Sequence, residues 1–189
     1  MFARTMLSAL PTALVALALS LLAPFGGAAQ LCAPLKNVIA SGDAFTAIRG
    51  ADLHPNDAFY RSVNMQDWAS LIELPRSSAT TITELGGEAM FTAVFGTWAF
   101  ADMFALSPQQ REEIDSQFKA LKADVLACLP GWARAKDVEW QIVLIGPTHA
   151  LELAVLDADG QHFSQRSNEA AVMKLRVRRK AAVQRLLQP

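Results

Sequence analysis

The chain has 189 residues, with 17 lysines and arginines against 18 aspartates and glutamates, so its formal net charge at pH 7 is −1. This near-neutral balance argues against a general nucleic-acid-binding protein, because such proteins carry a strongly basic surface. Hydrophobic residues make up 52% of the chain, and only two cysteines are present. These properties are typical of one globular domain with a core of its own.

The first 29 residues have the three regions of a secretory signal peptide. Arg4 supplies the positive charge, and residues 6–22 are almost wholly apolar. Gly27 and Ala29 then stand at positions −3 and −1 of a small-residue cleavage site. We therefore expect residues 1–29 to be a signal peptide that is removed on export.

Two other interpretations of this segment stay open. One is an uncleaved anchor, since the apolar run is about long enough to cross a bilayer, although Pro11 interrupts it. The other is a lipoprotein, because Cys32 follows closely, but Gln30 and Leu31 stand where small residues are needed. After cleavage, residues 30–189 are expected to form a single periplasmic or secreted domain without a membrane span.

Cys32 and Cys128 form an even pair in a chain that is expected to be exported, and they predict one disulfide. The alternative is two buried free thiols. The loop that this bond closes is long, so the chain-entropy model predicts ~4 kcal/mol of stabilisation or more, less any strain.

Two helices are predicted, one at each end of the first group of strands. Residues 31–47 carry apolar side chains near helical spacing. Ser107 and Gln110 have the spacing of a capping box and predict a helix over residues 108–129. The apolar stripe of this helix places Cys128 in the core from its last turn, so the simplest disulfide joins the two helices.

Alternation of apolar and polar residues predicts six strands in the rest of the chain. They cover residues 68–74, 79–85, 88–100, 138–144, 151–155 and 171–178. The polar residues 51–67 are expected to be an irregular connection, and residues 181–187 a short terminal helix. The pattern predicts an α+β fold: an antiparallel sheet of about six strands with two helices packed on one face, and one disulfide.

Three short motifs resemble those of a group of small exported bacterial proteins. They are Leu31-Cys32-x-x-Leu35-x-x-Val38, Phe45-x-x-Ile48-Arg49-Gly50 and Cys128-Leu129-Pro130-Gly131-Trp132. The resemblance implies the α+β layout of secretion chaperones: a helix, antiparallel strands, a second helix and further strands. Members often carry a second cysteine pair on the central strands, where this chain has threonine and alanine. The group has no assigned chemistry, so the resemblance transfers no functional residue.

No arrangement of reactive residues in the sequence is typical of an enzyme. His149 and His162 lie near two aspartates in predicted turns, but their spacing matches no compact metal-ligand motif. Residues 157–160 begin like a calcium loop, but no glutamate follows at the twelfth position. A nucleophile elbow of the Gly-x-Ser-x-Gly type is missing as well. We therefore expect no catalytic residue, no metal and no cofactor, with a small cell-envelope hydrolase as the alternative.

Two features are candidate partner-binding sites. Trp132 lies just past the second helix, where it either packs over the disulfide or marks a partner surface. The C-terminal segment has six cations with no acid among them: Lys174, Arg176, Arg178, Arg179, Lys180 and Arg185. Alternation places the first three on one face of a strand. This strand either binds an anionic partner or, as the pattern favours, lies at a sheet edge where its cations block pairing.

Together these features predict a non-enzymatic periplasmic or secreted binding protein, such as an inhibitor, an immunity factor or a chaperone. Its partner is expected to be a protein or an anionic component of the cell envelope, and not a nucleic acid. The sequence leaves the identity of that partner and the oligomeric state open.

Overall fold

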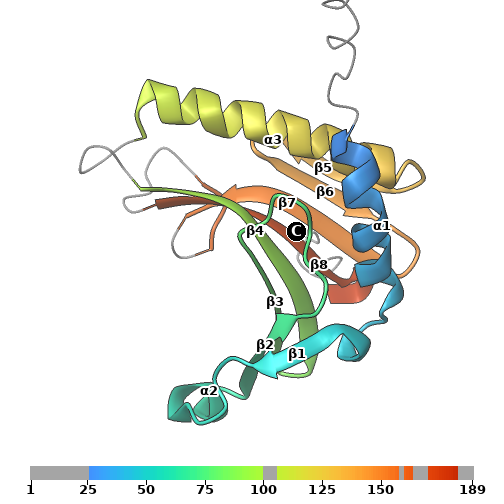
Figure 1. Ribbon diagram of the computed structural model, residues 1–189, viewed down its shortest axis with the longest axis vertical. Helices are drawn as coiled ribbons and strands as arrows, with labels where there is room; N and C mark the ends of the chain where they lie inside the picture. Colours follow the sequence, from blue (N-terminus) through green and yellow to red (C-terminus); the bar gives the residue numbers. More distant parts are fainter. Residues whose placement is uncertain (1–25, 100–105, 158–159, 164–169, 183–189) are drawn as a thin grey trace, which may run out of the picture.

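The computed structural model describes residues 26–99, 106–157, 160–163 and 170–182 (Figure 1). In chain order its elements are α1 (Gly26–Ala40), the 3-10 helix η1 (Thr46–Ile48), β1 (Arg49–Asp52), α2 (Ala58–Ser62), β2 (Met65–Ser70), β3 (Ala79–Leu85), β4 (Glu88–Ala99), α3 (Pro108–Cys128), β5 (Ala133–Val138), β6 (Gln141–Ile145), β7 (His149–Leu156) and β8 (Ala170–Arg179). The predicted α+β fold with an antiparallel sheet and one disulfide is confirmed. The sheet has eight strands, so the prediction of about six was too low.

Two four-stranded meanders build the sheet, whose strand order is β1-β2-β3-β4-β8-β7-β6-β5. The first meander follows α1 and the second follows α3. They join through their last strands, because β4 pairs antiparallel with β8. The chain thus repeats one unit, a helix followed by a meander, although the sequence shows no internal repeat. The consequence for function is that β8 lies in the middle of the sheet.

Local sequence explains the long helix α3. The Ser107 hydroxyl accepts the Gln110 backbone N–H at 3.2 Å, and the Gln110 side chain accepts the Ser107 backbone N–H at 2.8 Å. This is the predicted capping box, which satisfies two of the open N–H groups at the helix start. The predicted apolar stripe is buried: Ile114, Phe118, Leu121, Val125 and Cys128.

The first helix ends earlier than predicted. Helix α1 stops at Ala40, whereas the apolar spacing predicted helix to residue 47. Gly42 and Phe45 both have positive φ angles, 84° and 53°, and this left-handed backbone cannot continue an α-helix. The Phe45 side chain is nevertheless fully buried, so the core, and not helix periodicity, explains its apolar character.

Strands β1 and β5 were not predicted. The end of β1 and the whole of the short helix α2 lie in the segment expected to be irregular. The predicted strand over residues 138–144 is in fact a hairpin, because Val138 pairs with Gln141 and leaves Glu139 and Trp140 as the turn. Trp140 adopts a φ of 54° there, and its buried ring packs against that of Phe163, with 5.9 Å between centroids.

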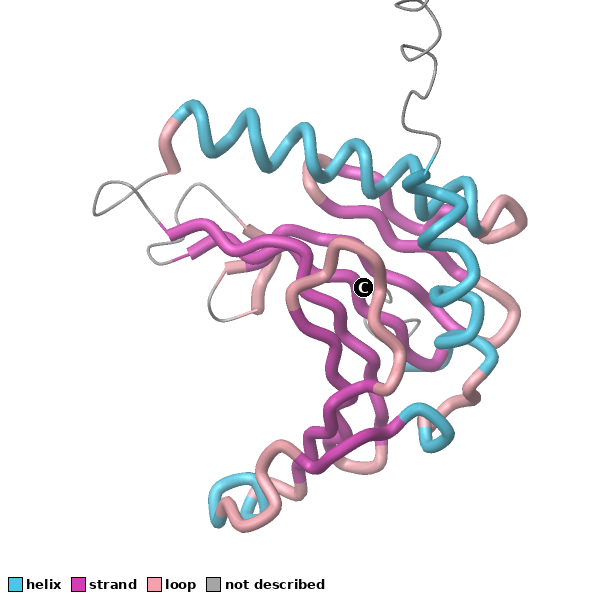
Figure 2. The backbone as a smooth tube through the Cα atoms, viewed as in Figure 1, coloured by secondary structure: helices cyan, strands magenta, loops and turns pink. Residues whose placement is uncertain are grey.

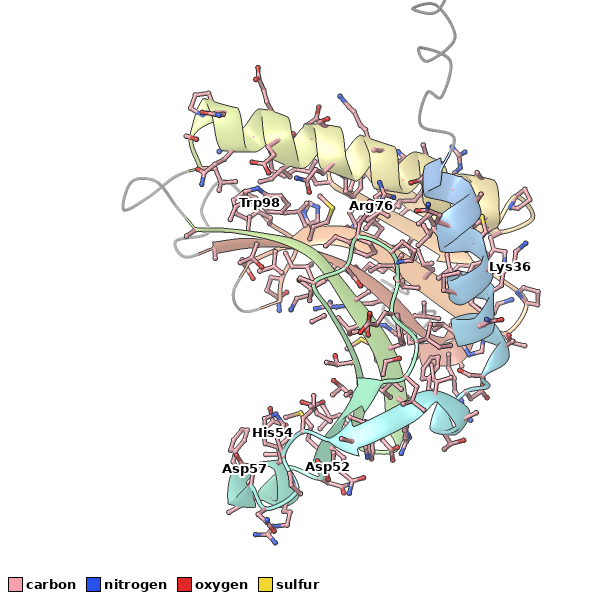
Figure 3. The ribbon with its side chains drawn as sticks, viewed as in Figure 1. Lys36, Asp52, His54, Asp57, Arg76 and Trp98 are labelled. Atoms are coloured by element: carbon pink, nitrogen blue, oxygen red, sulfur yellow. A yellow bond between two sulfur atoms is a disulfide. The ribbon has the colours of Figure 1, made fainter. Side chains whose placement is uncertain are left out.

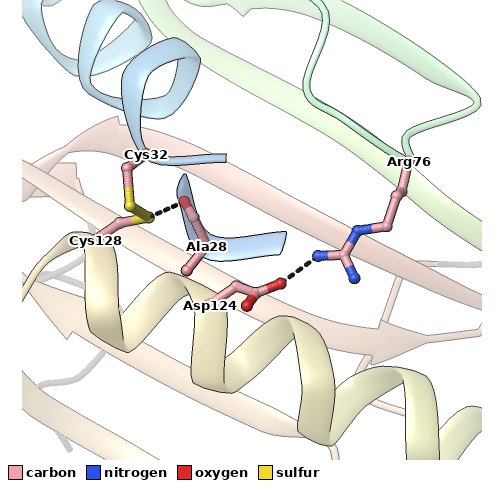
Figure 4. Close-up of a disulfide and its surroundings, with 5 residues drawn as sticks. All are labelled: Ala28, Cys32, Arg76, Asp124 and Cys128. Atoms are coloured by element: carbon pink, nitrogen blue, oxygen red, sulfur yellow. Dashed lines mark hydrogen bonds and ion pairs between the residues drawn. A yellow bond between two sulfur atoms is a disulfide. The ribbon is translucent and has the colours of Figure 1, made fainter. Parts of the chain in front are cut away.

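The disulfide between Cys32 and Cys128 joins α1 to the end of α3 (Figure 4). The Sγ atom of Cys128 also lies 3.6 Å from the carbonyl oxygen of Ala28, a contact without a hydrogen because the sulfur is oxidised. Arg76 and Asp124 form an ion pair nearby. The predicted disulfide is therefore confirmed, and it clamps both helices over one face of the sheet.

The expected signal peptide lies mostly outside the described residues, as does most of the predicted terminal helix. The expected cleavage point, after Ala29, falls inside α1, so cleavage would leave a helix that begins at Gln30. None of the helices in the described ranges is long and apolar enough to cross a membrane.

Candidate functional site

The C-terminal cations lie on a central strand. β8 pairs with β4 along one side and with β7 along the other. Its apolar residues, Met173, Leu175 and Val177, are fully buried beneath the helices, which places Lys174, Arg176 and Arg178 on the opposite face, as the alternation predicts. The edge-strand interpretation is wrong, because both sides of β8 are already paired and need no cations to block further pairing.

We call Lys174, Arg176 and Arg178 the cationic row. In Figures 1 and 2, β4 bends strongly and the helices α1 and α3 lie outside this bend. Trp98, on the helix-covered face, points toward α3 (Figure 3). The cationic row therefore lies on the other face, inside the bend, which we call the inner face. Its neighbours in strand register are Thr92, Met90 and Val94 of β4, and Ala150, Glu152 and Ala154 of β7.

One carboxylate forms ion pairs with two guanidinium groups of this row. Glu152 lies opposite Arg176, and its Oε2 atom is 3.6 Å from Arg176 Nη1 and 3.4 Å from Arg178 Nη2. Its Oε1 atom accepts a hydrogen bond from Gln141 Nε2 at 2.7 Å. The side chains of Glu152 and Arg176 are each only 16% exposed, and that of Arg178 is 21% exposed. The Nε atoms of both arginines are buried without a hydrogen-bond partner in the described part of the chain.

Lys174 has an apolar setting. Its neighbours across the strands are Val94 and Ala154, and within the described ranges no ion pair or hydrogen bond reaches its ammonium group. Burial, and after it the charge of Arg176, lowers the pKa of Lys174. Burial also lowers the pKa of Arg176, against the opposing effect of Glu152, but a guanidinium stays charged in proteins. The folded chain thus holds two cations, Lys174 and Arg176, in surroundings that disfavour their charged forms.

Replacing Lys174 by methionine is expected to stabilise the fold by up to about 1 kcal/mol at pH 7, because solvent still screens a half-buried ammonium. The unfolded chain binds more protons than the folded one at pH values between the lowered pKa and the ordinary value of 10.5. Wild-type stability therefore rises with pH in that window, and the advantage of Lys174→Met shrinks. Urea unfolding at several pH values measures this, with the exposed Lys119→Met as control; equal behaviour of the two variants would contradict it.

A small hollow of about 200 Å³ lies beside the row, and Arg178 and Arg179 both line it. The side chain of Arg179 lies outside the cationic row, since its Nε donates to Asp43 Oδ2 at 2.8 Å. The other walls are mainly apolar, with one hydroxyl: Leu85, Ala89, Met90, Ala182 and Thr83, together with Glu88. The hollow therefore combines charge with apolar surface.

Trp132 lies in a different place. It lines a groove of about 540 Å³ with Lys36 of α1, Cys128 and the turn that contains Pro147. Its ring covers Gly146, where an added Cβ would come within 2.4 Å of the ring. Trp132 thus packs beside the disulfide and still borders a groove, but it is not part of the inner face.

A further apolar surface lies at the opposite end of the sheet from α3, at α2 (Figure 3). Leu53, Phe59 and Val63 are exposed, at 44%, 63% and 40%. The ring of His54 stacks on that of Tyr60, with 3.9 Å between centroids. The polar sequence of residues 51–67 predicted only an irregular connection here.

A buried histidine was also missed. His149 is 2% exposed, and its Nδ1 atom lies 2.9 Å from the Thr148 hydroxyl. Its Nε2 atom is 3.7 Å from Asp43 Oδ1, which is too long for a hydrogen bond. The strand alternation that places Leu151 in the core contained the signal for this burial. In the described ranges, no three His, Cys, Asp or Glu side chains come together as metal ligands.

No protein-family model matches the chain, and no curated protein or solved structure is significantly similar to it. The resemblance to small exported bacterial proteins therefore stays a hypothesis.

Alanine at His54, His149 or His162 is expected to leave partner binding unchanged, because none of these side chains lies in the cationic row. His149→Ala is expected to lower the melting temperature, since it removes a buried ring 5.8 Å from that of Phe45 and costs about 2 kcal/mol. Thermal unfolding and a hydrolysis screen test this. Loss of a hydrolytic activity at an unchanged melting temperature in any of these variants would favour the alternative, a small cell-envelope hydrolase.

Proposed function

We propose that this chain is a non-enzymatic binding protein of the periplasm or the extracellular space, which holds an anionic partner against the inner face of its sheet. The observation that carries this proposal is the cationic row: three cations on a central strand, with Glu152 the one carboxylate within 4 Å of any of them among the described residues. The partner is a protein or an envelope component with anionic groups. An inhibitor, an immunity factor and a chaperone all act in this way, and the sequence resemblance favours the chaperone.

The energetics of the row support a binding role over a structural one. Removing a cation from water costs several kcal/mol, and a single shared carboxylate offsets only part of that cost for three cations. Apolar side chains at these positions would stabilise a central strand more than cations do. Groups that lower the stability of the free protein are typical of binding surfaces, because a bound partner supplies the interactions that these groups lack.

The compartment rests on two features. A disulfide persists in oxidising environments, which include the periplasm and the extracellular space. The N-terminal segment has the charge, the apolar run and the small-residue site of an export signal. Intact-mass measurement of the protein recovered from the periplasm of an expressing host is expected to show a chain that begins at Gln30.

The test of the binding role uses charge variants of the exported protein as bait for envelope extract. Lys174→Gln/Arg176→Gln removes two charges from the row. The control, Lys119→Gln/Arg134→Gln, removes two exposed charges from other surfaces. Wild type and control are expected to retain the same components at low salt and release them as salt rises, because exposed charges are screened over about 8–10 Å at physiological ionic strength. Retention of those components by the row variant would overturn the proposal.

A further inference from the structure

We infer that the exposed apolar surface at α2 docks into the groove beside Trp132 of a second copy, so that the chain associates head to tail. We call the first surface, made of Leu53, Phe59 and Val63, the tip. The groove is the space of about 540 Å³ that Trp132 and Lys36 line. This inference goes beyond the proposed function, because neither surface includes the cationic row.

The side chains of the tip form a preorganised apolar surface. Phe59 and Val63 are four residues apart, so they lie on the same side of the helical turn. The ring of Phe59 meets that of Tyr60 edge-on, with 6.0 Å between centroids, and Tyr60 stacks in turn on His54. Phe59 is nevertheless 63% exposed. An aromatic side chain that is held in place and left exposed is typical of an interface anchor, because little entropy is lost when it binds.

The groove is suited to such an anchor. Its walls are mainly apolar: Ile39, Ala40, Leu129, Pro130, Trp132 and Pro147. The disulfide of Cys128 and the packing of the Trp132 ring on Gly146 hold these walls in place. The volume lies within the range of about 300–1,000 Å³ that is usual for ligand sites, so the groove has room for more than one apolar side chain.

The charges of the two surfaces are complementary. Residues 52–67 contain three aspartates against one arginine, a net charge of −2 with the histidine neutral. Lys36 is the one charged residue that lines the groove, and none of the ion pairs found in the described ranges involves it. Asp57 precedes Phe59 by two residues, so a docked Phe59 brings a carboxylate toward Lys36. An anionic bilayer repels the tip, which therefore fits this groove better than a lipid surface.

The tip and the groove lie well apart on one molecule, as the positions of Asp57 and Lys36 in Figure 3 show. The tip therefore contacts a second copy and not the groove of its own chain. A contact between two different surfaces leaves one tip and one groove open in each dimer, so it can extend to longer assemblies. The contact area is small, and we expect a dissociation constant of about 100 µM.

Sedimentation velocity of the exported protein tests this contact. Wild type is expected to form larger species as the concentration rises toward about 1 mM. Phe59→Ser and Ala40→Glu are each expected to stay monomeric, because the first removes the anchor and the second places a carboxylate in the groove. Their matched controls, Val138→Ser and Ala33→Glu, change exposed positions outside both surfaces and should associate as wild type does.

A mixture of the two defective variants gives the sharpest result. Phe59→Ser keeps an intact groove and Ala40→Glu keeps an intact tip, so the mixture is expected to form dimers and nothing larger. A monomeric wild type, a monomeric mixture, or association that either variant retains would overturn the inference. Wild type that stays monomeric but binds phosphatidylglycerol vesicles through Phe59 would also overturn it, in favour of a lipid surface.

Two further measurements separate this contact from other effects. Lys174→Gln/Arg176→Gln should associate as wild type does, so failure of the head-to-tail contact leaves anion binding by the inner face unaffected, and the reverse also holds. Melting curves of Phe59→Ser and Ala40→Glu establish that both variants are folded, as expected for two exposed positions.

Discussion

The Cys128→Ala variant is expected to lose about 4 kcal/mol of unfolding free energy. The disulfide to Cys32 closes a loop with a sequence separation of 96 residues, and the chain-entropy model assigns its largest stabilisation to such long loops. A domain of this size has a total stability of roughly 5–15 kcal/mol. The variant should therefore unfold at a much lower urea concentration, and α1 should lose its covalent link to α3.

Two controls make this prediction specific. Cys32→Ala should lose the same amount, and the double variant should lose no more than either single variant, because all three remove one bond. Urea unfolding with and without reductant measures these differences. Additive losses in the double variant, or two thiols that alkylate in the unfolded but unreduced wild type, would show that the bond does not form.

The Glu152→Ala variant is expected to lose about 2–3 kcal/mol. It leaves Arg176 and Arg178 without their shared carboxylate on a surface where their side chains are mostly buried, and removing one partner of such a group exposes the full desolvation cost of the other. Urea unfolding measures the loss. The matched control is Glu112→Ala, an exposed position on α3.

A second substitution separates charge from packing. Adding Arg176→Met to Glu152→Ala removes one of the two unpaired cations and should recover part of the lost stability. If Glu152→Ala is as stable as Glu112→Ala, or if Arg176→Met makes it worse, the electrostatic description of the row is incorrect.

Local signals in the sequence were sufficient for the elements that depend on neighbours along the chain. The capping box at Ser107 and the apolar stripe that follows predicted α3 to within one residue at its end. The alternation in β8 predicted which side the cations face. The hairpin between β5 and β6 was not predicted, because its turn carries no residue typical of turns. Trp140 occupies a left-handed position there that glycine or asparagine more often fills.

The sequence did not predict which strands pair when they lie far apart along the chain. Nothing in the residues of β8 indicates that β4 lies beside it, because that pairing joins the ends of two meanders. The cations were therefore assigned to an edge, when they lie in the middle of the sheet. For the same reason, Glu152 and Gln141 were not predicted as neighbours of the cationic row. They lie beside it only because of the register of β6, β7 and β8.

The side-chain Nε–Hε resonances of the arginines give the most direct view of the row. Titration of the full chain with short polyphosphate and with polyglutamate, followed by nitrogen-15 NMR, is expected to shift the signals of Arg176 and Arg178 saturably with at least one of these polyanions, since their Nε–H groups are unpartnered among the described residues. The exposed Arg61 and Arg134 should respond weakly and in proportion to ionic strength. Shifts confined to the exposed arginines, or none at Arg176 and Arg178 with either polyanion, would contradict an anion-binding inner face.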